Sequence, residues 1–209
     1  IERMVDILAA ELKMDPVEVR LKNFVPPSDF PYDTPTGLSY DSGNYAAILE
    51  KTLDLAGYAQ LREEQKKGRE EGRLIGIGLS TYGEICAFGP SPALPTGGWE
   101  SATVKIEPTG QVTVMSGISP HGQGSETSFS QITADELGVD IEDIVVAHGD
   151  TATVQHGVGT FGSRNTAVGG TALFLALREL KEKIERYGSM LLESENVTYS
   201  GGVCTCNKT

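Results

Sequence analysis

The chain has 209 residues, of which 39% are hydrophobic, and a formal net charge of -12. This length is sufficient for one large or two small domains with a buried core. We expect neither nucleic acid nor a membrane as a partner, because both repel an acidic surface and no apolar run reaches the ~18 residues that span a bilayer.

The first segment predicts helices. The first helix is indicated by apolar residues at helical spacing, which are Ile1, Met4, Val5, Leu8 and Leu12. A second helix is indicated by a capping residue at Asp15, Pro16 at the first helical position and Glu18 three residues after the cap.

The chain from Phe24 to Tyr40 is rich in proline, serine, aspartate and glycine, which predicts a linker or a covering loop. A third helix would follow a cap at Asp41 or Ser42 and stop at Gly57. The mixed charges from residue 61 to residue 73 indicate a solvated helix or linker. We therefore expect a helical segment with a Pro-rich covering loop over residues 1–72.

After residue 73 the apolar pattern changes to that of strands. "LIGIGLSTYGEI" (74–85), "ESATVKIEP" (100–108), "QVTVMSG" (111–117) and "IVVAH" (144–148) are the predicted strands, and the second and third form a hairpin. Between the hairpin and the strand over 144–148 we expect a helix that buries Phe129, Ile132 and Leu137 and ends at Gly138. Asp140 and Asp143 predict a short capped turn before the last of these strands.

The final third predicts one long helix. Its apolar stripe is formed by Leu173, Ala176, Leu177, Leu180 and Ile184. The last residues, "GGVCTCNKT", are typical of a strand whose partner is missing, and we expect the chain to be a piece of a longer protein. Residues 73–209 thus predict an α+β region of mixed short sheets with packed helices.

The cysteines and histidines offer weak sites. The chain has three cysteines, Cys86, Cys204 and Cys206, and this odd number argues against a disulfide framework. Cys204 and Cys206 form a lone C-x-C, which lacks the second ligand pair of a structural zinc site. A metal pair of His121 and His148 would need further ligands. Without a signal peptide the default location is cytoplasmic.

Two other candidate groups remain open alternatives. A hydrolase that used His121 with an acid such as Asp150 would need a nucleophile, and no serine or cysteine of the sequence lies in a nucleophile elbow. Glu84 is a candidate pocket residue, although a solvated carboxylate is the more common case.

Two Gly-rich loops, each placed directly before a helix, carry the strongest signal. In His121-Gly122-Gln123-Gly124 the glycines allow a sharp turn and a close approach to a ligand, and the helix that follows offers free N–H groups to an anion. The second loop, from His156 to Thr166, adds hydroxyls and the guanidinium of Arg164. We expect the pair to bind one phosphorylated cofactor in a zone of local positive potential. Neither loop fits the Walker pattern, and the glycines from Gly76 lack the Rossmann spacing.

Four stretches carry a resemblance to a known family. "YGEICAFGPS", "SPHGQGSETSFSQITADELGV", "VVAHGDT" and "GVGTFGSRNTAVGG" resemble the molybdenum-cofactor-binding domain of the xanthine dehydrogenase and aldehyde oxidase family. Within it they look most like the large subunits of aerobic carbon monoxide dehydrogenases. The resemblance extends from Ile1 to about Leu192. It implies a molybdenum-cofactor-binding-domain-like fold and an oxidoreductase that inserts oxygen derived from water.

The resemblance also implies cofactors and partners. The cofactor would be molybdopterin with molybdenum, in the form of the cytosine dinucleotide, while iron-sulfur centres and FAD would lie on partner subunits. The remaining partners would be the rest of the large subunit and a small-molecule substrate. The catalytic glutamate of the family has no counterpart here, so no residue is assigned as catalytic or metal-binding, and the piece alone should be inactive.

The implied cofactor-binding residues lie in the two loops. They are His121, Gly122, Gln123, Gly124, Thr127, Phe161, Gly162, Ser163, Arg164, Asn165 and Thr166. Gln123 would orient the pterin, and the residues from Ser163 to Thr166 would hold the pyrophosphate or nucleotide end. The alternative is a non-catalytic nucleotide-binding or interaction module that retains the same loops.

Overall fold

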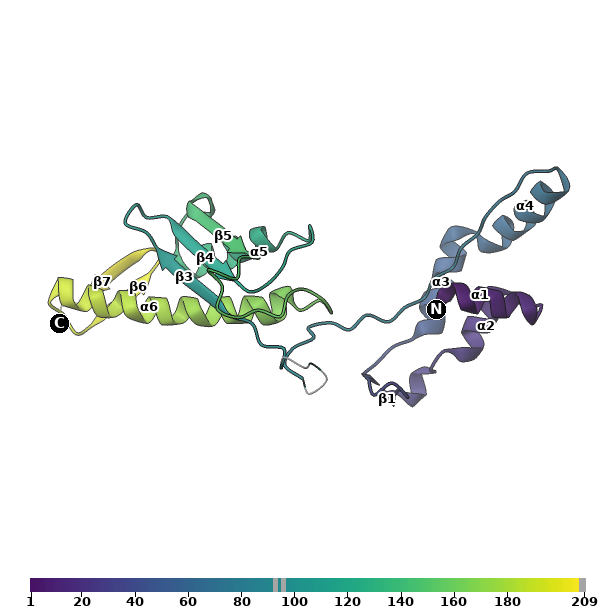
Figure 1. Ribbon diagram of the computed structural model, residues 1–209, viewed down its shortest axis with the longest axis horizontal. Coiled ribbons are helices and arrows are strands. Elements are labelled where there is room, and N and C mark those ends of the chain that lie inside the picture. Colours follow the sequence, from purple (N-terminus) through teal and green to yellow (C-terminus); the bar gives the residue numbers. More distant parts are fainter. Residues whose placement is uncertain (92–93, 95–96, 207–209) are drawn as a thin grey trace. The chain divides into compact units, whose positions relative to one another are not determined.

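The computed structural model describes residues 1–91, 94 and 97–206. The chain divides into two compact units, Ile1–Gly83 and Glu84–Thr209. Figure 1 labels their α-helices and most of their strands. The class is α+β, with helices and short mixed sheets. None of the helices in the described ranges combines the length and apolarity that crossing a bilayer requires.

The first unit is built from four helices, and the predicted capping and stop signals explain the start of α2 and the end of α3. They are α1 (Glu2–Glu11), α2 (Pro16–Asn23), α3 (Tyr45–Ala56) and α4 (Tyr58–Glu70). The Asp15 carboxylate accepts a hydrogen bond from the N–H of Val17 at 2.8 Å and caps α2 as predicted. Gly57, with φ of 63°, ends α3 as predicted.

The predicted cap of α3 at Asp41 or Ser42 was wrong. The helix begins at Tyr45, and the side chain of Asn44 accepts the capping bond from the N–H of Ala47 at 3.2 Å. Asparagine is as good a cap as aspartate or serine, so the sequence alone could not choose among the three.

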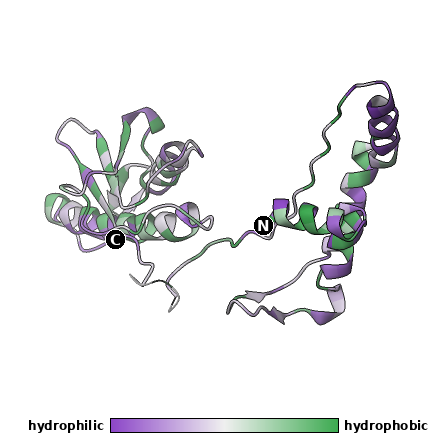
Figure 2. Ribbon diagram, turned by 45° about the vertical axis from the view of Figure 1, so that its right-hand side comes forward, coloured by the Kyte–Doolittle hydropathy of each residue, from purple (hydrophilic) through white to green (hydrophobic). Residues whose placement is uncertain are grey.

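The remaining parts of the first unit are a hairpin and a polar helix. The predicted covering loop contains a short 3-10 helix, η1 (Pro27–Asp29), and a pair of two-residue antiparallel strands, β1 (Tyr32–Asp33) and β2 (Ser39–Tyr40). The mixed-charge stretch lies in α4, which Figure 2 colours mostly hydrophilic. The prediction of a solvated helix there is confirmed.

The predicted strand over residues 74–85 was wrong, because these residues are extended but pair with no strand in the described chain. Side chains bind its backbone instead. The amide of Gln65 donates to the carbonyl of Ile75 at 2.8 Å, and the carboxylate of Glu2 accepts from the N–H of Thr81 at 2.6 Å. A strand is stable only with a neighbour in a ladder, and the apolar pattern does not reveal whether one exists.

The second unit is organised around a three-stranded sheet of order β3-β4-β5. Strands β3 (Ala102–Ile106) and β4 (Val112–Ser116) form the predicted antiparallel hairpin, and β5 (Ile144–His148) runs parallel to β4. The crossover between β4 and β5 contains α5 (Ser125–Leu137) and the 3-10 helix η2 (Ile141–Asp143). Gly138 ends α5 in the left-handed conformation, as predicted.

The long helix α6 (Gly170–Leu192) follows a π-helical segment, η3 (Asn165–Gly169). The strand predicted at the C-terminus is β7 (Val203–Cys206), but the expectation that its partner is missing was wrong. It pairs antiparallel with β6 (Val197–Ser200), a short strand that the sequence pattern did not reveal.

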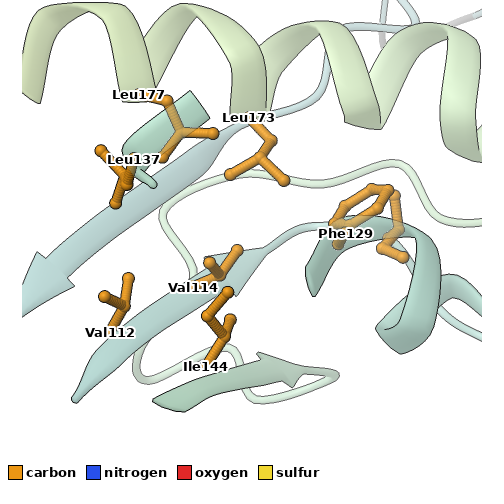
Figure 3. Packing of buried hydrophobic residues seen from close by; sticks show 8 residues of the cluster. Val112, Val114, Phe129, Leu137, Ile144, Leu173 and Leu177 are labelled. Carbon is orange, nitrogen blue, oxygen red and sulfur yellow. The ribbon is translucent and has the colours of Figure 1, made fainter. Parts of the chain in front are cut away.

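The core of the second unit lies between the sheet, α5 and α6. Residues on alternate positions of β4 are buried. Figure 3 shows the side chains of Val112 and Val114 on the side of the strand that packs against the helices. The cluster consists of Val112, Val114, Ile118, Phe129, Leu137, Ile144, Leu173 and Leu177. Each side chain stabilises the unit by about 1.5–3 kcal/mol, and together they fix the ends of β4 and β5 and the start of η3.

Candidate functional site

The first Gly-rich loop joins β4 to α5 and is anchored by the buried side chain of Ile118. Gly122 and Gly124 have φ of 97° and 77°, which glycine adopts without strain, and a Cβ at either position would point into open space. Gly124 is the N-cap of α5, and no side chain caps this helix. The first N–H groups of α5 therefore lack a capping side chain, and the helix dipole favours an anion at this end.

The side chains of the first loop hold its turn and leave donors free. The Oε1 atom of Gln123 accepts a hydrogen bond from the N–H of His121 at 2.5 Å. Within the described residues its Nε2 has no partner, and neither has the hydroxyl of Thr127 in the first turn of α5. All three side chains are exposed.

One acidic residue lies at the same helix start. Glu126 accepts a hydrogen bond from Nε2 of His148, at the end of β5, at 2.9 Å. The pKa of Glu126 is lowered, first by its own backbone N–H and then by His148. Its negative charge therefore persists to acidic pH and occupies one of the N–H groups at the start of α5.

The second loop makes its turn in a conformation that few residues adopt. Gly162 has φ of 56° and Ser163, although not glycine, has φ of 49°. A Cβ on Gly162 would lie 2.8 Å from Cβ of Phe88, so only glycine fits there. Strained residues of this kind, followed by a π-helical segment, are often found at functional sites.

The polar surface of this loop comes from two hydroxyls. Ser163 and Thr166 are exposed, and their hydroxyls have no partner among the described residues. Phe161, which is 39% exposed, packs edge-on against Phe88 with ring centroids 6.0 Å apart. Its ring also lies under the Arg164 guanidinium, at 5.3 Å.

Arg164 is fully buried, and its guanidinium is directed into the protein. It forms an ion pair with Glu100, whose side chain is also inaccessible to solvent. Its remaining bonds go to the carbonyls of Phe88 at 3.0 Å, Gly159 at 2.7 Å and Gly98 at 2.5 Å. All three nitrogens of the guanidinium therefore donate to groups of the protein, and its charge is balanced by Glu100.

Asn165 is buried as well and connects the two loops. Its Oδ1 accepts from the hydroxyl of Thr160 at 2.5 Å, and its Nδ2 donates to the hydroxyl of Ser125, the first residue of α5, at 2.7 Å. The hydroxyl of Thr160 in turn accepts from the N–H of Ser119 at 3.0 Å. His121 adds a contact of 3.3 Å from Nε2 to the carbonyl of Thr160. The two loops therefore lie side by side at the starts of α5 and η3.

The structure gives no support to the alternative sites. The described residues contain no group of three His, Cys, Asp or Glu that could hold a metal ion. Asp150 accepts from the N–H of Ala152 at 2.8 Å, and no contact joins it to His121 within the described chain. Glu84 is exposed, and the three cysteines are free.

Sequence reasoning missed the residues that support the loops, which are Glu100, Ser125 and Thr160. A weak signal existed for Glu100, because Arg164 is the only Lys or Arg in either loop and a buried arginine needs an acid. Nothing in the sequence indicated which acid it was.

The free groups of the site fit a phosphorylated ligand. They are the uncapped N–H groups at the start of α5, an amide and three hydroxyls, all of which can donate hydrogen bonds. Two open glycine positions leave room for close approach. No unpaired cationic side chain lies in the two loops as described. An anion would thus be held by neutral donors and helix dipoles rather than by a charged side chain.

Comparison with known proteins gives a consistent match. Residues 51–209 match the sequence profile of the molybdopterin cofactor-binding domain. The carbon monoxide dehydrogenase large chain of Afipia carboxidovorans is 42% identical over 202 residues, which are 92% of this chain and 25% of that one. The chain thus spans about a quarter of the length of the curated relatives it matches.

Solved structures agree with the sequence match. Reconstituted CO dehydrogenase from Oligotropha carboxidovorans has a TM-score of 0.64 and 38% identity, covering 96% of this chain and 26% of that chain. Quinoline 2-oxidoreductase from Pseudomonas putida 86 has a TM-score of 0.66 and 31% identity, covering 98% and 27%.

Proposed function

Because this chain belongs to the molybdopterin cofactor-binding domain family, we propose that its two Gly-rich loops together hold the pterin cofactor of a molybdenum hydroxylase. The observation that carries the proposal is the bonding of Asn165 to both Thr160 and Ser125, which fastens the second loop beside the open start of α5. The proposed fold is accordingly that of a molybdenum-cofactor-binding domain.

The first loop would bind the pterin. Gln123 keeps its Oε1 on the N–H of His121, and its free Nε2 would donate to the cofactor. Gly122 and Gly124 permit the close approach, while the first N–H groups of α5 and the hydroxyl of Thr127 face the same ligand. His121 would act mainly by keeping the turn against Thr160.

The second loop would bind the pyrophosphate or nucleotide end. The hydroxyls of Ser163 and Thr166 and the N–H groups after Gly162 are the candidate donors, and Phe161 offers an exposed aromatic surface. Arg164 and Asn165 would contribute from beneath, because their polar atoms already bind protein groups.

When bound, the cofactor supplies a molybdenum centre that takes two electrons from a substrate, with oxygen derived from water. The residues of this chain would bind and orient it. Iron-sulfur and flavin subunits would receive the electrons, the cofactor would take the cytosine dinucleotide form, and the rest of the large subunit would provide the catalytic base. The names of the relatives include carbon monoxide and quinoline, so the proposal does not specify the substrate.

The test is the molybdenum and released cytidine nucleotide per chain, measured on the intact large subunit assembled with its partner subunits. Gln123→Ala should lower both, because it removes the free amide and the bond that holds the His121 turn. A loss of about tenfold in affinity corresponds to the ~1.4 kcal/mol of one or two hydrogen bonds.

The matched control is Gln111→Ala, which removes an exposed glutamine from the turn between β3 and β4. It should leave metal and nucleotide content at the wild-type level. A fully assembled wild type with neither metal nor nucleotide would instead favour a non-catalytic binding or interaction module.

A further inference from the structure

The carboxylate of Glu100 lies beneath the second loop, in the kind of position where an external anion would be expected. Its Oε1 accepts from the N–H of Val158 at 3.1 Å, from the N–H of Gly159 at 3.2 Å and from Arg164. Two successive N–H groups and a guanidinium form an anion-binding site, and here it is filled by a side chain of the same chain. We propose that Glu100 is a positioning residue, an internal anion that sets the second loop before the cofactor binds.

The pair of Glu100 and Arg164 connects three separate segments. Arg164 itself binds the carbonyls of Phe88 and Gly98, which precede β3, and that of Gly159 in the second loop. The neighbouring Ser101 reinforces the attachment, because its hydroxyl bonds to both the carbonyl and the N–H of His156, at 2.5 and 3.2 Å. The start of the loop is thus bound to the segment before β3 through side chains of Glu100 and Ser101.

The backbone packs closely beneath the loop, so that only glycine fits at Gly117 and Gly157. A Cβ on Gly157 would lie 2.3 Å from the carbonyl oxygen of Gly117, and one on Gly117 would lie 2.6 Å from Oε2 of Glu100. This Oε2 atom is buried and has no hydrogen-bond partner within the described chain.

A buried carboxylate oxygen without a hydrogen-bond partner costs free energy, so stability alone does not explain why Glu100 is there. A buried ion pair is weak evidence for stability, since apolar residues of similar volume often serve as well, and its best-attested use is to specify one conformation. The conformation specified here is that of residues 157–166, which contain the strained turn at Gly162 and Ser163. The inference rests on the proposed function, because the loop is positioned for the cofactor.

The experiment uses the intact, assembled enzyme and compares Glu100→Gln with Glu100→Asp. Glutamine keeps the size of the side chain and loses its charge, whereas aspartate keeps the charge and loses length. The readouts are the rate at which cytidine nucleotide is released during incubation in cofactor-free buffer and the hydrogen exchange of residues 157–166. Glu142→Gln is the control, because Glu142 is an exposed acid of the same unit.

We expect Glu100→Gln to release the nucleotide about tenfold faster or more, as is typical when a buried charge loses its partner. Exchange should rise in residues 157–166 and stay unchanged in β4 and β5. Glu100→Asp should retain the nucleotide longer than Glu100→Gln, because charge rather than volume holds the loop. The control should match the wild type.

Four outcomes would overturn the proposal. A Glu100→Gln enzyme that equals the wild type in release and exchange would exclude positioning while leaving the proposed function intact. Faster exchange throughout the second unit, or better retention by glutamine than by aspartate, would indicate a merely structural role. A wild type without cofactor would overturn the proposed function and the positioning role with it.

Discussion

Arg164 and Asn165 follow one another in the sequence, and both turn into the protein. Their neighbours Ser163 and Thr166 are exposed. This alternation separates the residues that can touch a ligand from those that hold the loop. For Arg164 the reason is electrostatic, since Glu100 is inaccessible to solvent and a buried carboxylate requires a partner.

We predict that Asn165→Ala lowers the free energy of unfolding of the second unit. It would leave the hydroxyls of Ser125 and Thr160 without their shared partner, at a cost of about 1–3 kcal/mol. Urea unfolding followed by the fluorescence of Trp99, the only tryptophan, measures it. Asn196→Ala, which removes an exposed asparagine, should change little; equal midpoints for the two variants would contradict the role of Asn165 as a link.

At the scale of elements, the two helices of the site begin without a side-chain cap. α5 starts after Gly124, and η3 and α6 form one continuous helical run from Asn165. Close contact of this run with the first loop occurs at Gly169, where a Cβ would lie 2.5 Å from Cγ2 of Ile118. Ile118 is in the core and cannot move aside cheaply, so the contact fixes the distance between the first loop and η3.

Two adjacent glycines allow this contact to be tested. Gly169→Ala should destabilise the second unit by about 1–3 kcal/mol through overpacking against Ile118. Gly170→Ala is the matched control, because its Cβ would lie 3.5 Å from Ile132, an ordinary contact, and alanine favours the helix by about 0.5–1 kcal/mol. The measurement is the thermal unfolding of both variants. A Gly169→Ala variant as stable as Gly170→Ala would mean that the contact with Ile118 does not fix the distance between the first loop and η3.

At the scale of the whole molecule, the two units are stabilised in different ways. The second has a continuous apolar core, whereas the buried apolar residues of the first are the smaller set of Ala9, Val17, Val19 and Leu49. The first unit relies in addition on the buried Arg20, which binds Glu2, Asp6 and the carbonyl of Leu79. Polar bonds from Glu2 and Arg20 thus attach the extended segment after α4 to the helices.

The first unit should therefore be sensitive to acid. The N–H of Thr81 and then the Arg20 guanidinium lower the pKa of Glu2 below its ordinary value of 4.5, against desolvation, which raises it. A group with a lowered pKa stabilises the fold above the unfolded value, and this stabilisation is lost as the pH falls through the folded value. The loss should thus occur below pH 4.5.

Glu2→Gln tests this dependence. At pH 7 it should reduce the hydrogen-exchange protection of α1 and α2 by up to about 1 kcal/mol, and the difference from wild type should shrink as the pH falls below 4.5. Glu18→Gln, which removes an exposed partner of Lys22, should have little effect at any pH. A Glu2→Gln difference that stayed constant down to pH 3 would show that the carboxylate charge is not the cause.

Local sequence determined the elements whose signals lie within a few residues. The signals at Asp15, Gly57 and Gly138, the hairpin of β3 and β4 and the stripe of α6 each act through neighbours in the chain. The same locality explains why the family could be identified, since the two Gly-rich motifs are contiguous. Local sequence failed for the strand over 74–85 and the partner of β7, where strand pairing decides, and for the cap of α3, where Asn44 caps the helix instead of Asp41 or Ser42.

Tertiary structure decided what each polar residue of the site does. The sequence places Arg164 and Asn165 beside Ser163 and Thr166 as equivalent donors, but Glu100, 64 positions away, draws the guanidinium inward, and Ser125, 40 positions away, draws in the amide. Burial and partner choice depend on which distant segments meet, and no local pattern contains that information. The sequence by itself thus determined where the candidate site lies along the chain, whereas packing between distant segments decided which of its polar side chains are exposed and which are bound within the protein.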